Sequence, residues 1–579
     1  MRASRVYTAV SLLAWVAASS SLTGCSDDGP PETTPPYEPP ADFVVNERIV
    51  YTDGLHNENT EMLVLDDRII LIFRGGESGQ IGSDQAHINV YASTDGGETF
   101  SKQSEVSGGA LEGMRDIRDP KLLEMNGKVF LYAIARLPGG HYRDMGGEAW
   151  TVRAESSDKG VTWTAPEKTL TDLDDNGDEH FWGLWRITKR VSSEGETLYA
   201  LGYDDGDVRV AMFSSQDGVT WERRSLVMDS YADVPSEAEL QFFGDDEDTA
   251  VALVRLDNQG ILQDGQSAIC TSHAPFDSWE CGRRIEQRLD GPTWLSTEID
   301  GARRNFVVAR KHLPCTYKRT AIYELRGDLT DPSADIQVCE VEVLPSAGDT
   351  AYTALAHLQD SQYLVSWYSS VIPTQGDVAW LDGTYSPADI WLANIDFAEA
   401  PGLDVCNPPP AKTECQPPPL PQADASQAAS GEFLFAVAPV IYPAELLPLR
   451  ATATVSAGSM SLELQPLDGT TLEPVGEAFA ATSVTMSPSG TFTATFPEVV
   501  PIPAESYPLL NDPFLTLRNL EVTGAWLSSG AFCGYLTGAA QVIGASNADA
   551  LDLAGSTFGA PRIVGGELPA AVGSCADTP

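Results

Sequence analysis

Basic residues are scarce in this sequence. Its 579 residues include 36 Lys and Arg against 83 Asp and Glu, and the formal net charge is −47. Because nucleic-acid binding draws its affinity from clustered cations, this balance excludes a nucleic acid as a partner. Histidine is also scarce: the seven residues show no HExxH or comparable spacing, which argues against a catalytic zinc. Hydrophobic residues still make up 42% of the chain, so it can bury a substantial core.

The N-terminus has the pattern of a secretory signal. Two arginines precede a mainly apolar run, residues 6–15, which leads into small residues and is too short to span a membrane as a mature helix. Residues 22–25 (LTGC) resemble a bacterial lipobox, which implies cleavage before Cys25 and lipidation of its thiol. A plain secretory signal with an incidental cysteine is the alternative. Residues 26–42 contain six prolines and five acidic residues, and they predict an extended tether.

These N-terminal features predict a location in the bacterial cell envelope. Ser26 directly follows Cys25 in place of an Asp, which favours the outer membrane or the cell surface. We expect a monomer that contacts the membrane through its lipid anchor only.

Eight further cysteines follow the signal. In an oxidising compartment an even number of cysteines predicts disulfides, although the sequence does not fix which cysteines pair. None has the paired spacing of a zinc site. The simplest expectation joins nearest neighbours: Cys270/Cys281, Cys315/Cys339, Cys406/Cys415 and Cys533/Cys575.

Composition divides the remaining chain into two domains. Residues 399–430 carry proline triplets and many Ala, Ser and Gln residues, which is typical of an interdomain linker. Residues 431–579 alternate short apolar runs with Gly, Pro, Asn and Asp turns, which predicts a small β-sandwich. Its Trp526 is weak support for a sugar-stacking surface, and a structural appendage is favoured over a spacer, a docking module or a carbohydrate-binding domain.

The larger segment, residues 43–398, contains an internal repeat. Residues 93–100 (STDGGETF) recur as residues 156–163 (SSDKGVTW) and, one residue shorter, as residues 215–221 (SQDGVTW), about 60 residues apart. A hairpin explains these residue types, because Ser and Asp side chains bond turn amides, Gly takes positive φ and the aromatic residue anchors the turn. The repeat length fits a four-stranded propeller blade, and the segment has room for six blades.

The repeated string S-x-D-x-G-x-T-W, with its aspartates at Asp95, Asp158 and Asp217, is the Asp-box. Three copies in a secreted all-β chain resemble the six-bladed propellers of the sialidase (neuraminidase) superfamily. Asp-boxes are structural turns that also occur in noncatalytic propellers, so the function has to be argued from the site.

The sialidase resemblance implies a particular set of site residues. The substrate carries a carboxylate on its anomeric carbon, so arginines hold the anion, and a neutral Tyr activated by a Glu replaces the usual carboxylate nucleophile. In this chain the resemblance assigns Arg255 and Arg310 to the clamp. It makes Tyr352 the nucleophile, Glu237 its base and Asp84 the acid/base residue, in the sialidase order along the chain.

The first arginine of the family pattern is missing. Most sialidases begin with an aromatic-Arg-Ile-Pro motif, whereas this chain has His56, Asn57 and Thr60 there. It is more similar to sialidase-like bacterial proteins of uncertain substrate, which share a His-Asn start, an FRxG strand end, a D-x-R-D-P turn (residues 116–120) and a WRIT strand. The arginines of the last three features are the candidates for the missing cation: Arg74, Arg118 and Arg186.

Each of these assignments also has a structural interpretation. The arginines can pair with neighbouring acids or stack on tryptophans, Tyr352 can be a core tyrosine, and Asp84 and Glu237 can be solvated loop acids. Residues 172–177 (DLDDNG) copy the opening of a calcium loop, but the twelfth position is Gly183 where a Glu is required. A solvated acidic turn is therefore favoured over calcium, and no other cofactor is expected.

Two functions follow from these residues. The first is an exo-acting, retaining glycoside hydrolase that releases terminal sialic acid or a related acidic sugar from glycans. The second, motivated by the missing arginine motif, is a noncatalytic surface propeller that binds such glycans. In the first case Tyr352 and Glu237 must lie within hydrogen-bond reach of each other.

Overall fold

A computed structural model describes much of the chain after the predicted tether. The described residues are 43–79, 83, 86–108, 113–114, 116–136, 149–169, 171–173, 179–193, 195–204, 208–257, 265–370, 379–409, 415–456, 459–507, 515–542 and 551–579. The predicted signal with Cys25, the tether and Asp84 lie outside them. Within these ranges no helix combines the length and the apolar character needed to cross a membrane.

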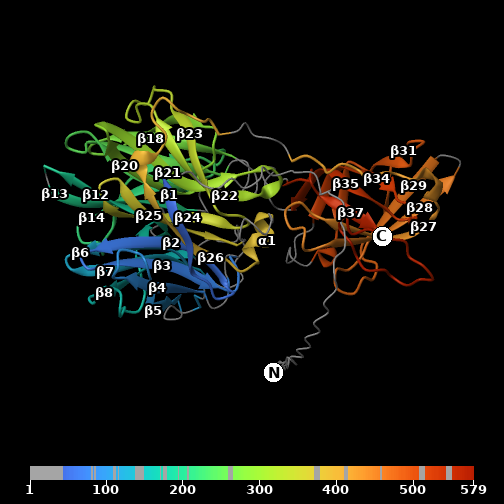
Figure 1. The fold of residues 1–579 in the computed structure, drawn as a ribbon, viewed down its shortest axis with the longest axis horizontal. Coiled ribbons are helices and arrows are strands. Elements are labelled where there is room, and N and C mark those ends of the chain that lie inside the picture. Colours follow the sequence, from blue (N-terminus) through green and yellow to red (C-terminus); the bar gives the residue numbers. More distant parts are fainter. Residues whose placement is uncertain are drawn as a thin grey trace. The chain divides into compact units, whose positions relative to one another are not determined.

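Six four-stranded antiparallel sheets form a propeller (Figure 1). The first blade contains β2 (His56–Leu65), β3 (Arg68–Gly76), β4 (His87–Ser93) and β5 (Ser101–Ser107). The second contains β6 (Asp116–Met125), β7 (Lys128–Arg136), β8 (Ala149–Ser156) and β9 (Glu167–Lys168). The third contains β12 (Gly183–Ser192), β13 (Gly195–Asp204), β14 (Arg209–Ser215) and β15 (Glu222–Asp229).

The remaining blades have the same order of strands. The fourth contains β16 (Pro235–Phe243), β17 (Thr249–Leu256), β18 (Gln266–His273) and β19 (Glu280–Ile285). The fifth contains β20 (Asp290–Ile299), β21 (Ala302–His312), β22 (Lys318–Arg326) and β23 (Gln337–Leu344). The sixth contains β24 (Thr350–Gln359), β25 (Gln362–Ser369), β26 (Asp389–Asp396) and, as its outer strand, β1 (Val44–Tyr51).

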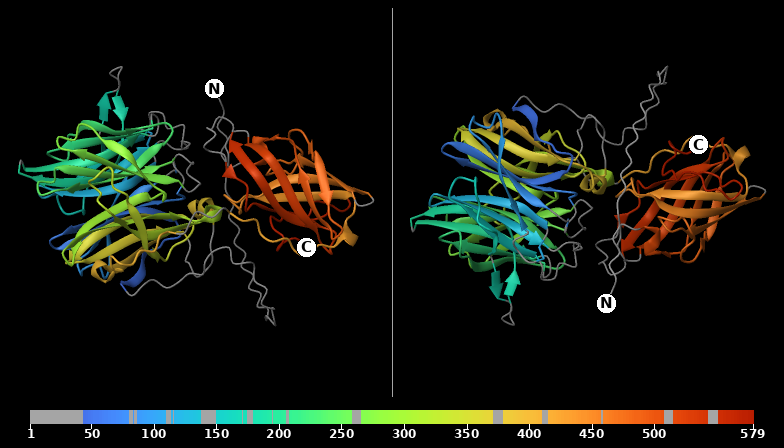
Figure 2. Two further views of the ribbon diagram at one scale, coloured as in Figure 1. Left: turned by 90° about the horizontal axis from the view of Figure 1, so that it is seen from above. Right: turned by 90° about the horizontal axis from the view of Figure 1, so that it is seen from below.

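The two ends of the propeller close on each other within the sixth blade. Strand β1 pairs antiparallel with β26, so the first strand completes the last sheet (Figure 2, blue beside yellow). The inner strands β2, β6, β12, β16, β20 and β24 contact one another in this cyclic order. The first residues of these six strands are thereby brought around one axis, where the candidate site is found.

Each pair of neighbouring blades is held together by its own apolar cluster. A blade has a neighbour on both faces, so its middle strands are apolar on both faces; all eight residues of β17 (TAVALVRL) are buried, for example. The blade contacts are anchored by buried residues such as Ile72, Trp182, Leu240, Val307 and Trp367. Such packing, repeated around the ring, explains why short strands form a stable domain.

The three S-x-D turns join the third and fourth strands of the first three blades. In the first of them Ser93 Oγ accepts from Gly97 N at 2.8 Å, and Asp95 Oδ1 accepts from Thr99 N at 3.0 Å. The turn at Asp158 repeats both contacts, at 2.8 Å each. These bonds satisfy the turn amides at the outer side of each blade, remote from the inner strands.

Two smaller elements interrupt the propeller. A hairpin of β10 (Thr171–Leu173) and β11 (Glu179–Phe181) brackets the acidic stretch considered for calcium. Its Asp172 forms an ion pair with Arg223 (Oδ2 to Nε, 3.0 Å), while residues 174–178 lie outside the described ranges. The helix α1 (Trp380–Thr384) precedes β26. Short 3-10 helices occur at Pro314–Thr316, Phe397–Glu399, Ala425–Gln427 and Ala504–Ser506.

The C-terminal domain is a separate β-structure in which eleven strands form one continuous sheet. They are β27 (Gly431–Ala438), β28 (Leu447–Ser456), β29 (Ser459–Pro466), β30 (Phe479–Ala480), β31 (Ser483–Met486), β32 (Thr491–Thr495), β33 (Val499–Ile502), β34 (Leu515–Trp526), β35 (Phe532–Val542), β36 (Leu551–Asp552) and β37 (Thr557–Ala560). Strands β29 and β31, near opposite ends of the sheet, contact each other, so it folds over one apolar core. Trp526 belongs to that core and is fully buried, so it is not an exposed sugar-stacking surface.

The four disulfides correct part of the expected pairing. Cys270–Cys281 and Cys533–Cys575 join nearest neighbours as expected. The other two expected pairs are wrong, because the structure joins Cys315 to Cys415 and Cys339 to Cys406. Both of these bonds tie the linker to the fifth blade instead of closing a small loop within the linker.

Candidate active site

All six inner strands are irregular near their first residues. In each strand the pairing with its neighbour shifts within the first six residues, as in a β-bulge. A bulge leaves residues unpaired and redirects their side chains. Asn59, Asp119 and Tyr352 lie in three of these bulges with φ of 56°, 52° and 48°, a strained conformation that is typical of functional sites. The bulges therefore bring polar side chains from different blades together.

Tyr352, Glu237 and Arg255 form one hydrogen-bonded cluster, which we call the Tyr352 cluster. Tyr352 Oη donates to Glu237 Oε1 at 2.6 Å and accepts from Arg255 Nη1 at 3.1 Å. Arg255 Nη1 also lies 2.8 Å from Glu237 Oε2. Burial and the Glu237 carboxylate raise the pKa of Tyr352 well above its usual value, so the phenol is neutral at rest and has a proton acceptor in contact.

Arg255 is held in place by further carboxylates. Its Nε lies 2.9 Å from Asp257 Oδ1 and 3.1 Å from Asp290 Oδ1, and Arg288 Nε bonds the same Asp290 oxygen at 2.6 Å. Although burial by itself raises the pKa of Asp290, Arg255 and Arg288 hold it well below its usual value. This network fixes the guanidinium of Arg255 beside the phenol.

Arg310 approaches the same tyrosine from the fifth blade. Its Cζ lies 4.9 Å from the centre of the Tyr352 ring, in cation–π contact. Arg310 Nη2 donates to Asp349 Oδ1 at 2.8 Å and to Tyr368 Oη at 2.9 Å, and Trp380 Nε1 donates to the same carboxylate oxygen at 2.9 Å.

A second group of arginines converges on Glu58. Arg74 Nη1 lies 2.7 Å and Arg118 Nη2 lies 2.6 Å from Glu58 Oε1. The other oxygen, Oε2, lies 3.6 Å from His56 Nε2, which is in turn 3.5 Å from Asp349 Oδ2. His56 thus links the arginines of the first two blades to the carboxylate that holds Arg310.

These contacts give His56 an unusual titration. Burial lowers the pKa of His56, but Asp349 and Glu58 outweigh it and raise the pKa to about 9, against 6.5 for a free histidine. Its contribution to stability is therefore complete below about pH 6.5 and is lost as the pH rises through about 9. We predict that the free energy of unfolding, measured with urea, falls between pH 6 and pH 9.5 in the native protein. In His56→Gln this fall should be smaller by on the order of 3 kcal/mol.

The exposed His357 provides the control for this comparison. Its replacement by glutamine is expected to leave the pH dependence of the native protein intact. A His56→Gln variant with the same pH profile as the native protein would show that His56 is uncharged.

His56, Glu58 and Asp349 are also the one group with the residue types and spacing of a metal site within the described residues. The surrounding charges do not fit a cation. Arg74 and Arg118 bond Glu58, and Arg310 bonds Asp349, so three guanidinium groups already neutralise the two carboxylates. A divalent ion would add two further positive charges to a group in which arginines already pair with both carboxylates, so it is disfavoured.

Asp119 is a carboxyl group whose role the sequence did not reveal. It lies in the bulge of β6 and accepts a hydrogen bond from Asn59 Nδ2 at 2.5 Å. Burial raises the pKa of Asp119, and the nearby carboxylates of Glu237 and Glu58 add to the shift against the opposing effect of Arg118. It is a candidate proton donor beside the Tyr352 cluster.

A second network of charged and polar residues contains one residue from each of the six inner strands. Arg186 is its central member: Nη1 lies 2.6 Å from Glu61 Oε2 and Nε 2.9 Å from Glu239 Oε2. The guanidinium also donates to Thr293 Oγ1 at 2.6 Å and to the Thr353 carbonyl at 2.5 Å. Strand β6, the inner strand of the second blade, supplies Lys121, whose ammonium lies over the ring of Trp185. The structure thus brings Arg186 to an interblade network and not to the Tyr352 cluster.

We predict a structural effect when Arg186 is replaced. Arg186→Met removes the guanidinium that pairs with Glu61 and Glu239 and leaves Lys121 as the cation of this set, which should lower the free energy of unfolding by about 3–5 kcal/mol. Lys189→Met, on the same strand, removes an exposed pair with Glu196 and should cost less than about 1 kcal/mol. Denaturant unfolding measures both, and an unchanged stability in Arg186→Met would contradict the interpretation.

The structure thus brings together most of the residues suggested by the sequence. Four of them are in direct contact: Tyr352, Glu237, Arg255 and Arg310. Arg74 and Arg118 bind Glu58, which is connected to Arg310 through His56 and Asp349. The acids that hold these groups were not among the predicted residues, although the Arg-x-Asp spacing of Arg255 and Asp257, and of Arg288 and Asp290, was a signal for them. Asp84 is outside the described residues.

Comparisons with known proteins found matches among solved structures only. No protein-family model and no curated protein matches the chain. Among solved structures, a protein of unknown function from Dyadobacter fermentans is 17% identical (TM-score 0.45) over 62% of this chain and 100% of its own. The NanB sialidase of Streptococcus pneumoniae is 12% identical (TM-score 0.46; 61% and 71% covered), and the Trypanosoma rangeli sialidase is 12% identical (TM-score 0.42; 90% and 89% covered). The fold is the six-bladed propeller described above, and the role of each residue has to come from its own contacts.

Proposed function

We propose that the protein is an exo-acting glycoside hydrolase of sialidase type, which releases terminal sialic acid or a related acidic sugar from glycans with retention of configuration. The observation that carries this proposal is the 2.6 Å hydrogen bond from Tyr352 Oη to Glu237 Oε1. A substrate whose anomeric carbon carries a carboxylate would repel an anionic nucleophile. A neutral phenol paired with a carboxylate base avoids this repulsion.

The raised pKa of Tyr352 fits a concerted proton transfer. The phenol does not ionise in advance, so Glu237 takes its proton as Oη attacks the anomeric carbon. Water then hydrolyses the glycosyl-tyrosine: its proton passes to the carboxylate of the residue that protonated the leaving group, its oxygen bonds the anomeric carbon, and Glu237 returns the proton to the departing phenol. Arg255, in contact with Oη, stabilises the charge that develops on this oxygen.

The substrate carboxylate requires cations that are not fully paired. Within the described ranges, Arg255 Nη2 has no hydrogen-bond partner, and Arg310 Nη1 has only a 3.9 Å ion pair with Asp290. Arg118 Nη1 similarly has only a 3.8 Å contact with Asp116. These three nitrogens are the donors we assign to the carboxylate, with Arg118 in place of the missing first arginine and Arg74 holding Glu58 behind it.

The leaving group needs an acid. Asp84 has the position in the sequence that the sialidase resemblance implies, and Asp119 is buried with a pKa that burial and the nearby carboxylates raise, as a general acid requires. The two carboxyls are separated by experiment in the Discussion.

A panel of aryl glycosides that includes sialosides tests the proposed activity. We expect turnover of the sialoside and none of neutral glycosides, because the latter leave the arginines without their anion. Saturable binding of a sialoside without release of the aryl group would instead establish the noncatalytic glycan-binding function. Turnover of neutral glycosides alone would refute both functions.

The net charge of −47 predicts an effect of salt on substrate capture. Screening weakens the long-range repulsion between the protein and an anionic sugar more than it weakens buried arginine contacts. We therefore expect kcat/KM for a sialoside to rise as sodium chloride increases from low concentration to about 0.15 M. A fall in kcat/KM over this range would mean that the field near the site is positive.

A further inference from the structure

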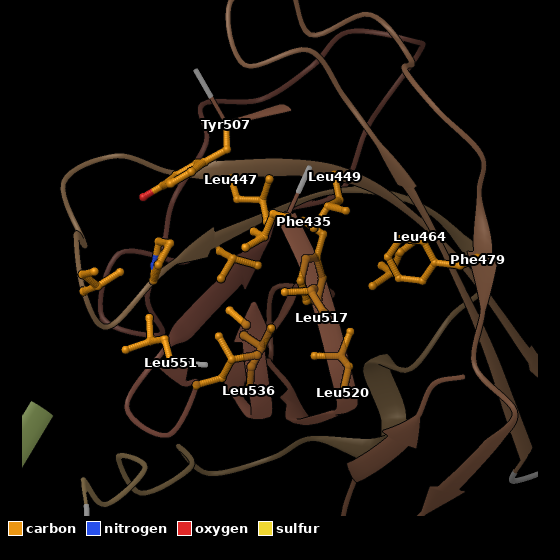
Figure 3. A pocket seen from close by; sticks show the side chains of 16 residues that line it. Phe435, Leu447, Leu449, Leu464, Phe479, Tyr507, Leu517, Leu520, Leu536 and Leu551 are labelled. Atoms are coloured by element: carbon orange, nitrogen blue, oxygen red, sulfur yellow. The ribbon is translucent and has the colours of Figure 1, made fainter. Parts of the chain in front are cut away.

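The C-terminal domain contains an apolar cavity inside its folded sheet (Figure 3). Side chains from β27, β28, β29, β34 and β35 line it, including Phe435, Leu447, Leu464, Leu517 and Leu536. All of the lining side chains except that of Tyr507 end in carbon atoms. In Figure 3 Tyr507 and Leu551 lie at one side of this group and Phe479 and Leu464 at the other.

The cavity is large for a protein interior. Protein cores are close-packed and contain few voids larger than a water molecule. This cavity offers about 130 Å³ to the centres of water-sized molecules, whereas one water needs roughly 10–15 Å³. A buried water also requires two to four polar partners, which a lining of leucine, phenylalanine and valine does not provide. The space therefore suits an apolar ligand better than water.

One polar group lies at this site without a partner. Tyr507 is 6% exposed, and among the described residues its Oη has no hydrogen-bond partner. A buried hydroxyl without a partner is unfavourable, so a ligand oxygen that accepts its hydrogen bond would relieve this cost.

The charge near Tyr507 narrows the chemistry of the ligand. Burial raises the pKa of the Tyr507 phenol, and the Glu445 carboxylate raises it further. Glu445 would likewise repel an anionic head group, as would the net charge of −47. A fatty acid carboxylate therefore fits this end of the cavity less well than an uncharged alcohol or ester.

We propose that the C-terminal domain binds a neutral single-chain lipid, a fatty alcohol or a monoacyl ester, with its hydrocarbon chain in the cavity and its oxygen bonded to Tyr507. The apolar lining binds the chain, and the Tyr507 hydroxyl selects the uncharged head group. This proposal does not depend on the function proposed for the propeller.

Fluorescence titration of the full-length protein with N-phenyl-1-naphthylamine, an uncharged apolar probe, tests the site. We expect saturation at one probe per chain and displacement by 1-lauroylglycerol. Ala540→Phe, which adds a ring inside the cavity, should weaken both affinities at least about tenfold. Ala539→Phe, the next residue on β35 and outside the lining, is the matched control and should bind as the native protein does.

The head group is tested separately. Tyr507→Phe removes only the hydroxyl and should weaken 1-lauroylglycerol about fivefold or more, with dodecanoate at pH 8 binding more weakly than the glycerol ester to the native protein. The absence of saturable probe binding, or equal binding by Ala540→Phe and Ala539→Phe, would overturn the site. If thermal unfolding shows that Ala540→Phe does not fold, Ala540→Leu replaces it. Tighter binding of dodecanoate would overturn the assignment of a neutral ligand.

Discussion

Tyr352→Phe is expected to lower kcat for an aryl sialoside by about 10³-fold or more, because it removes the only atom that forms the bond to the sugar in the proposed mechanism. Phenylalanine keeps the ring that packs against Trp185 and lies under Arg310. The variant should therefore fold and still bind an unreactive sialic acid analogue. Initial rates, thermal unfolding and analogue binding together separate a loss of chemistry from a loss of structure.

Tyr368→Phe is the matched control for this experiment. Tyr368 is another buried tyrosine near Arg310, but its hydroxyl bonds Arg310 and Asp349 instead of Glu237. Its loss should raise KM by about tenfold or less through a looser Arg310 and leave kcat largely unchanged. Unchanged turnover in Tyr352→Phe, or an equal loss of kcat in both variants, would remove Tyr352 from the role of nucleophile.

The propeller could be predicted from the sequence because its signals are local. The turns at Asp95, Asp158 and Asp217 mark one position in three successive blades, and their spacing gives the length of a blade. The apolar runs between such turns require burial on both faces, which a ring of blades provides. The all-β C-terminal domain could be predicted for the same reason, from alternation and turn residues. Lipidation at Cys25 and attachment to the cell envelope stay predictions.

The residues of the site were predictable only where the sialidase resemblance reached them. That resemblance placed Tyr352, Glu237, Arg255 and Arg310, which do meet in space. Arg186 was a further candidate, and it does lie in a bulge, between Leu184 and Ile187 of β12. Its guanidinium nevertheless pairs with Glu61 and Glu239 from two other inner strands, and such contacts between strands are not visible in the pattern of a single sequence.

The disulfides and the acids were hidden for a similar reason. Cys315 and Cys415 are 100 residues apart, and their pairing depends on the path of the linker along the fifth blade. The sequence shows Asp119 only as one residue of the D-x-R-D-P turn, next to Arg118. Its bulge instead turns the carboxyl towards Asn59, Glu58 and Glu237, which are contributed by two other blades.

The identity of the general acid can be decided by varying the leaving group. A nitrophenolate leaves without protonation, whereas a sugar alkoxide does not, so loss of the acid impairs only the second kind of substrate. Asp119→Asn should therefore lower kcat/KM for a sialyl disaccharide by about 10²–10⁴-fold and for 4-nitrophenyl sialoside by about tenfold or less. Asp84→Asn provides the parallel variant, and the acid is whichever residue shows this leaving-group dependence.

The remaining outcomes of that comparison are also decisive. Asparagine keeps the hydrogen bond between position 119 and Asn59 available, so the bulge of β6 should be retained, and thermal unfolding checks this. A general acid works only in its protonated form, so if Asp119 is the acid, kcat/KM for the disaccharide should fall as the pH rises through its raised pKa, and Asp119→Asn should abolish this fall. An equal loss on both substrates would mean that Asp119 positions Glu237 or Glu58 and does not donate the proton. With neither variant sensitive to the leaving group, protonation would have to come from solvent, and the proposed mechanism would lose its acid.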